Sequence, residues 1–378
     1  MDLTLFFSAI EESLYEDISS PSSFYKNIKA YTDKIPDFKD AHIAIIGLSS
    51  DNNLAADTIR KKLYNLKRGT GSYRIVDLGN LKPGHDQDEN YTRVSEVCRM
   101  ILEQNVLPVL IGGTHDYTFG QYTAYETLNK LVSLLNIDAF LDLEDEPSAN
   151  MEQKHIHRIL MHEPNFLFNY IHMAYQSYLI DPVSVSVLEK LYFEAFRIGQ
   201  MRNNLQEMEP AIRHADLLSF DIAAIRSADA PGQYNPQPFG LTGEEACQIC
   251  WYAGHNEKLS SAGFYGYQVE KDQTNHQTAS VIATMIWYFI EGFYNRKNEQ
   301  NVKSNDFLKF TVSMPAEPSS ISFYKSKMSE KWWMEVPYPQ GKEKFARNSI
   351  IPCSYADYLA ATKGDVPERY ISTLAKLG

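Results

Sequence analysis

Three short apolar runs in this chain each end in a segment that carries polar residues. These segments are Gly112-Gly113-Thr114-His115-Asp116, Asp138-Ala139-Phe140-Leu141-Asp142 and Ser219-Phe220-Asp221-Ile222-Ala223. A short, continuous apolar run is typical of a strand that is buried on both faces of a parallel sheet. In open α/β sheets, ligands and catalytic residues gather at the carboxyl ends of such strands. The three segments therefore predict an α/β fold with a polar site at one edge of its sheet.

Strand-like runs alternate with helix-like segments through the middle of the chain. We expect strands at His42–Leu48, Tyr73–Leu78, Leu107–Ile111, Ser133–Ile137, Ala174–Ile180, Ala195–Ile198, Leu217–Phe220 and Ser261–Tyr267. Helical periodicity marks the segments between them, among them Ala55–Leu66, Tyr91–Gln104 and Leu241–Glu257. Such alternation indicates βα units. It predicts one doubly wound, three-layer α/β/α domain with a mostly parallel sheet of about eight strands.

Both ends of the chain depart from this alternation. Residues 1–40 have a helical pattern with a turn at Ser20-Pro21-Ser22-Ser23. The polar stretch Arg296–Asp306 is expected to be a loop, before a strand at Phe307–Met314 and a segment rich in tryptophan, tyrosine and proline. Large aromatic side chains in such a tail favour packing against the body. We therefore expect an N-terminal helical extension (1–40), an α/β domain (41–295) and a C-terminal extension packed on the same domain (296–378).

Charge and composition restrict the partners. The net charge is −12, from 36 basic and 48 acidic residues, which argues against non-specific binding to nucleic acid or to an anionic membrane. No apolar run approaches the roughly 20 residues that span a bilayer, and the first residues lack the features of a signal peptide. Four scattered cysteines are too few for a disulfide framework. A reducing, cytoplasmic setting is expected.

One cysteine pair and one histidine pair have spacings that could suggest metal sites, and we interpret both as structural residues instead. Cys247 and Cys250 form a CxxC pair, but they lie in an expected helix with no second pair to complete a zinc site. His155 and His157 lie in the helix-like stretch Met151–Met161, where residues two apart point in different directions. We therefore expect surface or core histidines there rather than a metal-binding pair.

In order, the three strand-end segments resemble the manganese-binding motifs GGDH, DAHxD and SFDxD. These motifs belong to the ureohydrolases, the family of arginase, agmatinase and formimidoylglutamase. Further similarity lies at Ala230-Pro231-Gly232 and Gly240-Leu241-Thr242, so that the resemblance spans roughly residues 41–295. It implies an arginase-like fold and a site that binds a small amidine or guanidine ligand. A homo-oligomer is implied as well, because family members commonly form trimers or hexamers.

The resemblance also implies a ligand set that is half complete. In the family, two manganese ions hold a bridging hydroxide. The ligands of the first ion match His115, Asp138, Asp142 and Asp221. The two ligands that only the second ion uses are replaced by Phe140 and Ala223, which carry no lone pair for a metal. Thr114 also replaces an aspartate. We expect zero or one manganese ion per chain and not two.

A further difference concerns the substrate. The family places a substrate-binding glutamate near the last core strand, and Gly266 matches that position best. No catalytic residue can be assigned from the sequence. The leading hypothesis is a catalytically weak or silent family member that serves as a binding or scaffold protein. The alternative is an active hydrolase of linear amidines, with formimidoylglutamate-like substrates favoured over arginine. The acidic run Glu144-Asp145-Glu146 is expected to be a solvated loop, and its alternative role is to supply the missing ligands.

Overall fold

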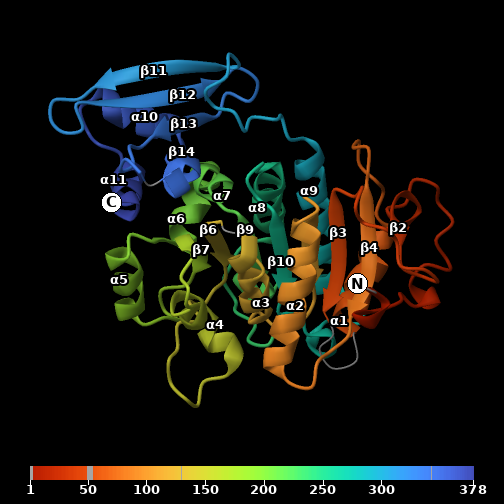
Figure 1. Cartoon of the computed structure of the whole chain (residues 1–378). Coiled ribbons are helices and arrows are strands. Elements are labelled where there is room, and N and C mark those ends of the chain that lie inside the picture. Colours follow the sequence, from red (N-terminus) through yellow and green to blue (C-terminus); the bar gives the residue numbers. More distant parts are fainter. Residues whose placement is uncertain (1–2, 49–53, 129, 342) are drawn as a thin grey trace.

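A mostly parallel ten-stranded sheet with helices on both faces forms the body of the protein (Figure 1). The computed structural model describes residues 3–48, 54–128, 130–341 and 343–378. Nine strands follow one another across the sheet in the order β1 (Phe7–Ser8), β4 (Ile75–Leu81), β3 (Ile43–Leu48), β5 (Leu107–Ile111), β10 (Ser261–Tyr265), β9 (Leu217–Asp221), β6 (Val132–Ile137), β7 (Leu167–Tyr175) and β8 (Glu194–Arg197). The tenth, β2 (Lys29–Ala30), pairs with β4, and among the described strands of this sheet only β1 runs antiparallel to its neighbour.

Two apolar clusters, one on each face of the sheet, form the three layers. Along β3, Ile43 and Ile45 belong to one cluster, whereas Ala44 and Ile46 belong to the other, because successive side chains of a strand point to opposite faces. The first cluster includes α1 (Leu54–Asn65), α6 (Ile198–Asn203), α7 (Glu209–Arg213), α8 (Gly243–His255) and α9 (Gln277–Tyr294). The second includes α2 (Gln87–Leu102), α3 (Tyr117–Thr123), α4 (Met151–Leu160) and α5 (Pro182–Lys190). The predicted α/β/α architecture is confirmed.

The C-terminal part of the chain builds a smaller unit of its own, which we call the C-terminal unit (307–378). Its antiparallel sheet contains β11 (Phe307–Ser313), β12 (Ser320–Ser326), β13 (Trp332–Glu335) and β14 (Ile350–Cys353), followed by α10 (Tyr355–Thr362) and α11 (Glu368–Leu377). Phe323 and Met334 are fully buried in its core, and Phe168 of β7 belongs to the same cluster. Figure 1 shows this unit at one end of the body, next to α7.

The N-terminal forty residues differ from expectation, because the predicted helical extension is wrong. Residues 3–40 contain only the short 3-10 helices η1 (Leu3–Leu5), η2 (Glu12–Leu14) and η3 (Tyr25–Asn27) besides β1 and β2. Phe7 pairs with Leu81 at the edge of the sheet, so its backbone hydrogen bonds are made between strands. The sheet consequently has ten strands rather than about eight. The boundaries at 40/41 and 295/296 stay predictions.

One strand of the body lies earlier in the chain than its apolar pattern suggested. The predicted strand Ala174–Ile180 is wrong, because β7 ends at Tyr175. The polar residues Asn169 and His172 interrupt the apolar pattern of β7, yet both are buried and hydrogen-bonded. Downstream, Asp181 caps α5 with Pro182 in its first turn, so residues 176–180 form a loop before that helix.

The remaining short elements and the cysteines complete the fold. The other 3-10 helices are η4 (Glu126–Leu128), η5 (Leu205–Met208), η6 (Ile222–Ala224), η7 (Val269–Lys271) and η8 (Glu343–Asn348). All four cysteines are free and buried, and Cys247 and Cys250 lie in the core on α8. In the described part of the chain, no helix combines the length and apolar character that crossing a bilayer requires.

Candidate metal centre

The three predicted segments meet at the carboxyl edge of the sheet. Their strands β5, β6 and β9 lie close together, with β10 between β5 and β9. Gly112 and Gly113, both at positive φ (77° and 73°), turn the chain from β5 toward α3, a backbone conformation that glycine adopts without strain. This turn brings His115 over the ends of β6 and β9, where the aspartates stand.

His115 stands at the centre of the cluster. Its Nδ1 lies 3.1 Å from Asp138 Oδ2, 3.3 Å from Asp142 Oδ2 and 3.4 Å from Asp221 Oδ2. Its Nε2 lies 2.9 Å from the Ser219 hydroxyl. When Nε2–H donates to Ser219, the lone pair of Nδ1 faces the three carboxylates. All four predicted ligand residues are therefore brought together in one place, as a metal site requires.

Backbone amides orient two of the carboxylates. The N–H of Phe140 donates to Asp138 Oδ1 at 3.2 Å, and the N–H of Ala223 donates to Asp221 Oδ1 at 2.6 Å. In each case the other oxygen, Oδ2, is left to face His115. The two positions that lack ligand side chains thus still help to hold the remaining ligands through their main chain.

Without a cation, this cluster can only be stabilised by holding protons. Burial, followed by the charge of neighbouring carboxyl groups, raises the pKa of Asp138 and of Asp221 to about 7. Burial also raises the pKa of Asp142. Burial by itself lowers the pKa of His115, but hydrogen bonding to Asp138 and Asp142 outweighs burial and raises that pKa above its ordinary value. Buried like charges must protonate or pair, and a divalent cation would replace these protons.

The donor set fits manganese. Three carboxylates and one imidazole offer the oxygen-rich environment that suits Mn²⁺. The two groups of side chains in the described chain that can hold a metal ion both include His115: one with Asp138 and Asp221, the other with Asp142 and His155. Within each group the ligand atoms lie within 4.8 Å of one another.

His155 is the site residue that sequence reasoning missed. It lies on α4, fully buried, with its ring centroid 4.4 Å from that of His115. Its Nδ1–H donates to the carbonyl oxygen of Glu152 at 2.7 Å, and the same nitrogen lies 3.8 Å from Asp142 Oδ2. Its Nε2 is buried with no hydrogen-bond partner among the described residues. Burial and the charge of His115 lower its pKa, so the ring is neutral and Nε2 has a free lone pair.

A signal for His155 existed in the sequence. It belongs to the face of α4 that also buries Ile156 and Ile159, so the helical period placed it inside the protein. His157 lies off this face and is partly exposed, as expected because residues two apart on a helix point in different directions. The period alone could not show that the buried face of α4 lies against His115.

A cavity opens next to His115 and the three aspartates, and the three positions that differ from the family motifs also line it. It has a volume of about 420 Å³, and Phe140, Ala223 and Gly266 are among its lining residues. Seven carboxylic side chains line it, and no lysine or arginine does. Gly266 has φ +82°, and a Cβ atom there would lie 2.5 Å from Asp221 Oδ1. A glutamate at position 266 would therefore displace one of the four predicted ligands.

Comparison with known proteins supports the predicted fold and family. The arginase family model matches residues 42–291. The formimidoylglutamase of Clostridium tetani is 25% identical over 254 residues, covering 62% of this chain and 75% of the relative. That of Photorhabdus laumondii is 22% identical over 245 residues, covering 58% and 76%.

Solved structures give the same fold. A Trypanosoma cruzi formiminoglutamase with Mn²⁺ superposes with a TM-score of 0.62 at 18% identity, covering 69% of this chain and 96% of that one. The Bacillus subtilis formimidoylglutamase gives 0.61 at 15% identity, covering 75% and 99%.

Proposed function

The chain belongs to the arginase family, as its strand-end segments predict, and on this premise we propose that it holds one manganese ion rather than two. The ligands of that ion are His115, Asp138, Asp142 and Asp221. The protein is then a weak or silent amidine hydrolase that binds a small ligand or serves as a scaffold. A homo-oligomer and a cytoplasmic setting stay predictions from the sequence.

One observation supports this proposal: side chains matching all four ligands of the first ion lie together, whereas the two ligands specific to the second ion are missing. Nδ1 of His115 lies within 3.4 Å of an oxygen of all three aspartates. Phe140 and Ala223, which line the same cavity, provide neither a nitrogen nor an oxygen atom from their side chains. A second cation would lack these two ligands.

The geometry also indicates what the cavity can bind. A bound metal ion lowers the pKa of a coordinated water. The protein's own contribution is to hold the ion with three buried side chains and the partly buried Asp142, and to surround it with carboxylates, which attract cations. An amidinium or guanidinium ligand fits this charge. Loss of one preorganised donor costs about 3 kcal/mol of barrier, so the lack of an entire second cation is expected to reduce turnover by several orders of magnitude.

A second candidate function rests on His155. Its ring lies next to that of His115 and its Nε2 has no partner among the described residues, so we infer that this imidazole is available as a ligand from outside the three strand-end segments. Glu152, one turn earlier, lines the cavity, and burial raises its pKa to about 7. If these two side chains complete a second metal position, the protein is an active hydrolase of linear amidines.

Metal analysis separates the two candidates. The purified protein is loaded with Mn²⁺, desalted and measured for manganese per chain, beside His155→Ala and the control His157→Ala on the same helix. One ion in all three proteins supports the first candidate. Two ions in the wild type and in His157→Ala, but one in His155→Ala, would replace it with the second.

Activity provides an independent measurement. Urea release from arginine or agmatine is expected at background, and formamide release from formimidoylglutamate slow or absent. Steady turnover on the order of 1–1000 per second would contradict the proposal of a weak or silent protein.

A further inference from the structure

A second and larger cavity lies at the opposite edge of the sheet, far from the aspartate cluster in the fold. We call it the seam cavity, and its volume is about 740 Å³. From the body it is lined by residues at the amino ends of strands, including His42, Leu107 and Ser260. From the C-terminal unit it is lined by residues that include Lys331 and Arg347. The seam cavity therefore lies between the body and the C-terminal unit.

Basic side chains dominate this cavity, although the whole chain carries a net charge of −12. Among the lining residues only Glu257 and Glu299 are acidic, against seven lysines and arginines, which are Lys130, Arg213, Lys258, Arg296, Lys303, Lys331 and Arg347. The excess of positive charge is local and opposes the charge of the protein as a whole.

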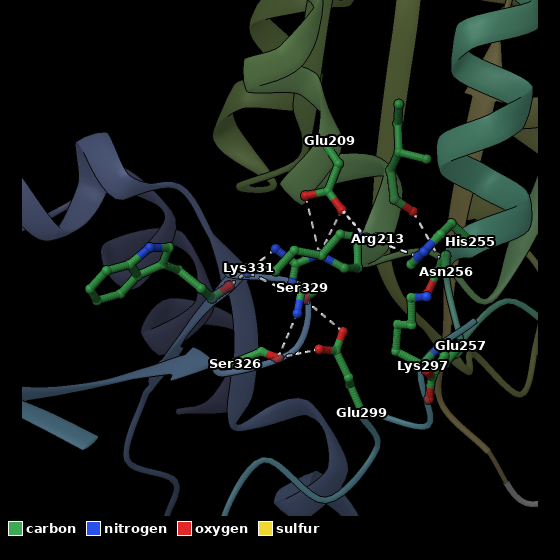
Figure 2. Close-up of polar contacts among 12 residues, drawn as sticks. Glu209, Arg213, His255, Asn256, Glu257, Lys297, Glu299, Ser326, Ser329 and Lys331 are labelled. Atoms are coloured by element: carbon green, nitrogen blue, oxygen red, sulfur yellow. Dashed lines mark hydrogen bonds and ion pairs between the residues drawn. The ribbon is translucent and has the colours of Figure 1, made fainter. Parts of the chain in front are cut away.

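Two carboxylates next to the cavity are each shared by two cations. Glu209 lies 2.9 Å from Arg213 Nε and 3.0 Å from Lys331 Nζ, and Figure 2 shows it between these two side chains. Asp216 lies 3.1 Å from Lys258 Nζ and 2.6 Å from Arg347 Nη2. Each of these groups of three keeps one unbalanced positive charge. Each group contains one residue from the C-terminal unit and two from the body.

Of the other cations, Lys303 is balanced by Glu335 at 2.7 Å, whereas Arg296 is not balanced by an acidic partner within the part of the chain that the structure describes. Arg296 packs over Phe293, with its Cζ 4.2 Å from the ring centroid, and forms no ion pair among the described residues. The carboxylate of Glu299 accepts from the hydroxyls of Ser326 and Ser329, and Glu257 accepts from the N–H of Lys297 (Figure 2). Neither glutamate forms an ion pair in the described part of the chain.

Several buried atoms of the lining residues lack hydrogen-bond partners among the described residues. They include three nitrogens, Nη1 of Arg213, Nε2 of His214 and Nδ1 of His42, and one oxygen, Oε2 of Glu257. Because Asn169 Nδ2 donates to Nδ1 of His214 at 3.3 Å, Nε2 of that ring carries the proton. At least two of these atoms are therefore donors, which an oxygen-rich group can satisfy.

The pKa shifts agree with a site that is short of negative charge. Burial, with a further contribution from Arg347, lowers the pKa of Lys258. Burial and the charge of Lys331 lower the pKa of His255 to about 4. Burial and four surrounding cations, Lys258 first among them, lower the pKa of His214. An anion between these groups would relieve the repulsion.

We propose that the seam cavity binds a small molecule that carries several negative charges, as phosphate or carboxylate groups, and thereby joins the C-terminal unit to the body. The volume lies in the range of small-molecule sites. Arginine and lysine side chains are the groups that proteins use to hold phosphates and carboxylates. Since the cavity and the aspartate cluster lie at opposite edges of the sheet, this site is separate from the proposed metal site.

Calorimetry on the protein, first stripped of metal with EDTA and then dialysed into chelator-free buffer, tests the proposal with two probes, inorganic pyrophosphate and citrate, at constant ionic strength. Saturable binding of one probe molecule per chain is expected, with potassium chloride as the blank. Binding of pyrophosphate alone identifies phosphate as the recognised group, and binding of citrate alone identifies carboxylate. Saturable binding of neither probe overturns the proposal. Because EDTA removes metal ions, this result does not depend on the metal site.

Substitutions then locate the binding. Arg347→Gln, whose side chain is 43% exposed, is expected to weaken binding at least about tenfold, the value of one lost charged hydrogen bond. Arg226→Gln is the matched control, because Arg226 is 40% exposed and also pairs with an aspartate, Asp229, away from the cavity. Equal weakening in both variants would show that the probes respond to overall charge. If Arg347→Gln does not fold, Lys130→Gln, an exposed lining residue, takes its place.

Discussion

Gly266 offers the sharpest test of how tightly the candidate metal site is built. At φ +82°, any side chain there is strained, and a Cβ atom would lie 2.5 Å from Asp221 Oδ1 and 2.8 Å from Asp221 Oδ2. Gly266→Ala must therefore push aside a carboxylate that faces His115. The left-handed backbone costs about 1 kcal/mol for a residue with a Cβ. Overpacking adds roughly 1–3 kcal/mol.

A second glycine separates the two contributions. Gly364 in the C-terminal unit has φ +95°, and a Cβ there would meet only Pro315 side-chain atoms at 3.5 and 3.6 Å, an ordinary contact. Gly364→Ala is therefore expected to lose only about 1 kcal/mol. Urea unfolding with EDTA measures both variants, and the difference between them reports the contact with Asp221.

Manganese then distinguishes a displaced ligand from simple strain. At an ion concentration a hundred times the dissociation constant, binding stabilises the folded state by about 2.7 kcal/mol. Wild type and Gly364→Ala should both gain this stabilisation on addition of Mn²⁺, and Gly266→Ala should lose most of it. The reasoning is refuted if Gly266→Ala unfolds like Gly364→Ala and gains as much from manganese as the wild type.

Three further predictions follow from the structure. The double substitution Phe140→His with Ala223→Asp should gain one Mn²⁺ per chain in calorimetry while each single substitution gains little; an unchanged stoichiometry in a folded double variant would contradict the assigned positions. In the metal-free protein, the pKa of Asp138 and of Asp221 is raised from 3.8 to about 7, so their contribution to stability is present below pH 4 and lost as the pH rises toward 7. Manganese competes with these protons, so the thermal shift it produces should be larger at pH 8 than at pH 5.5, and equal shifts would argue against binding at these carboxylates. Phe323→Ala, in the core of the C-terminal unit, should lower the free energy of unfolding by about 3–5 kcal/mol, measured in urea, and a loss below 1 kcal/mol would mean that this core is not packed as described.

The strand-end site shows how far the sequence predicts this protein. The continuous apolar runs placed His115 and the three aspartates at strand ends that meet at a common edge, and the resemblance to the ureohydrolase motifs marked them as expected metal ligands. The same reasoning misplaced β7, where Asn169 and His172 interrupt the run. Both are buried because partners from other elements satisfy them: the former contacts His214 and the latter the carbonyl of Asp138. Partners of this kind are not visible in a local pattern.

The sequence by itself determined the layered α/β fold, the four residues at the strand ends and the lack of ligand side chains at positions 140 and 223. The fold follows from the period of apolar residues, and the ligand positions follow from the resemblance of three short segments to the ureohydrolase motifs, so both can be recognised in local stretches of sequence. Only the tertiary structure decided that the ring of His155 lies next to that of His115 and that a basic cavity lies between the body and the C-terminal unit. Both depend on helices and loops that are distant in the chain, and their contact is set by packing rather than by any repeating pattern of residues.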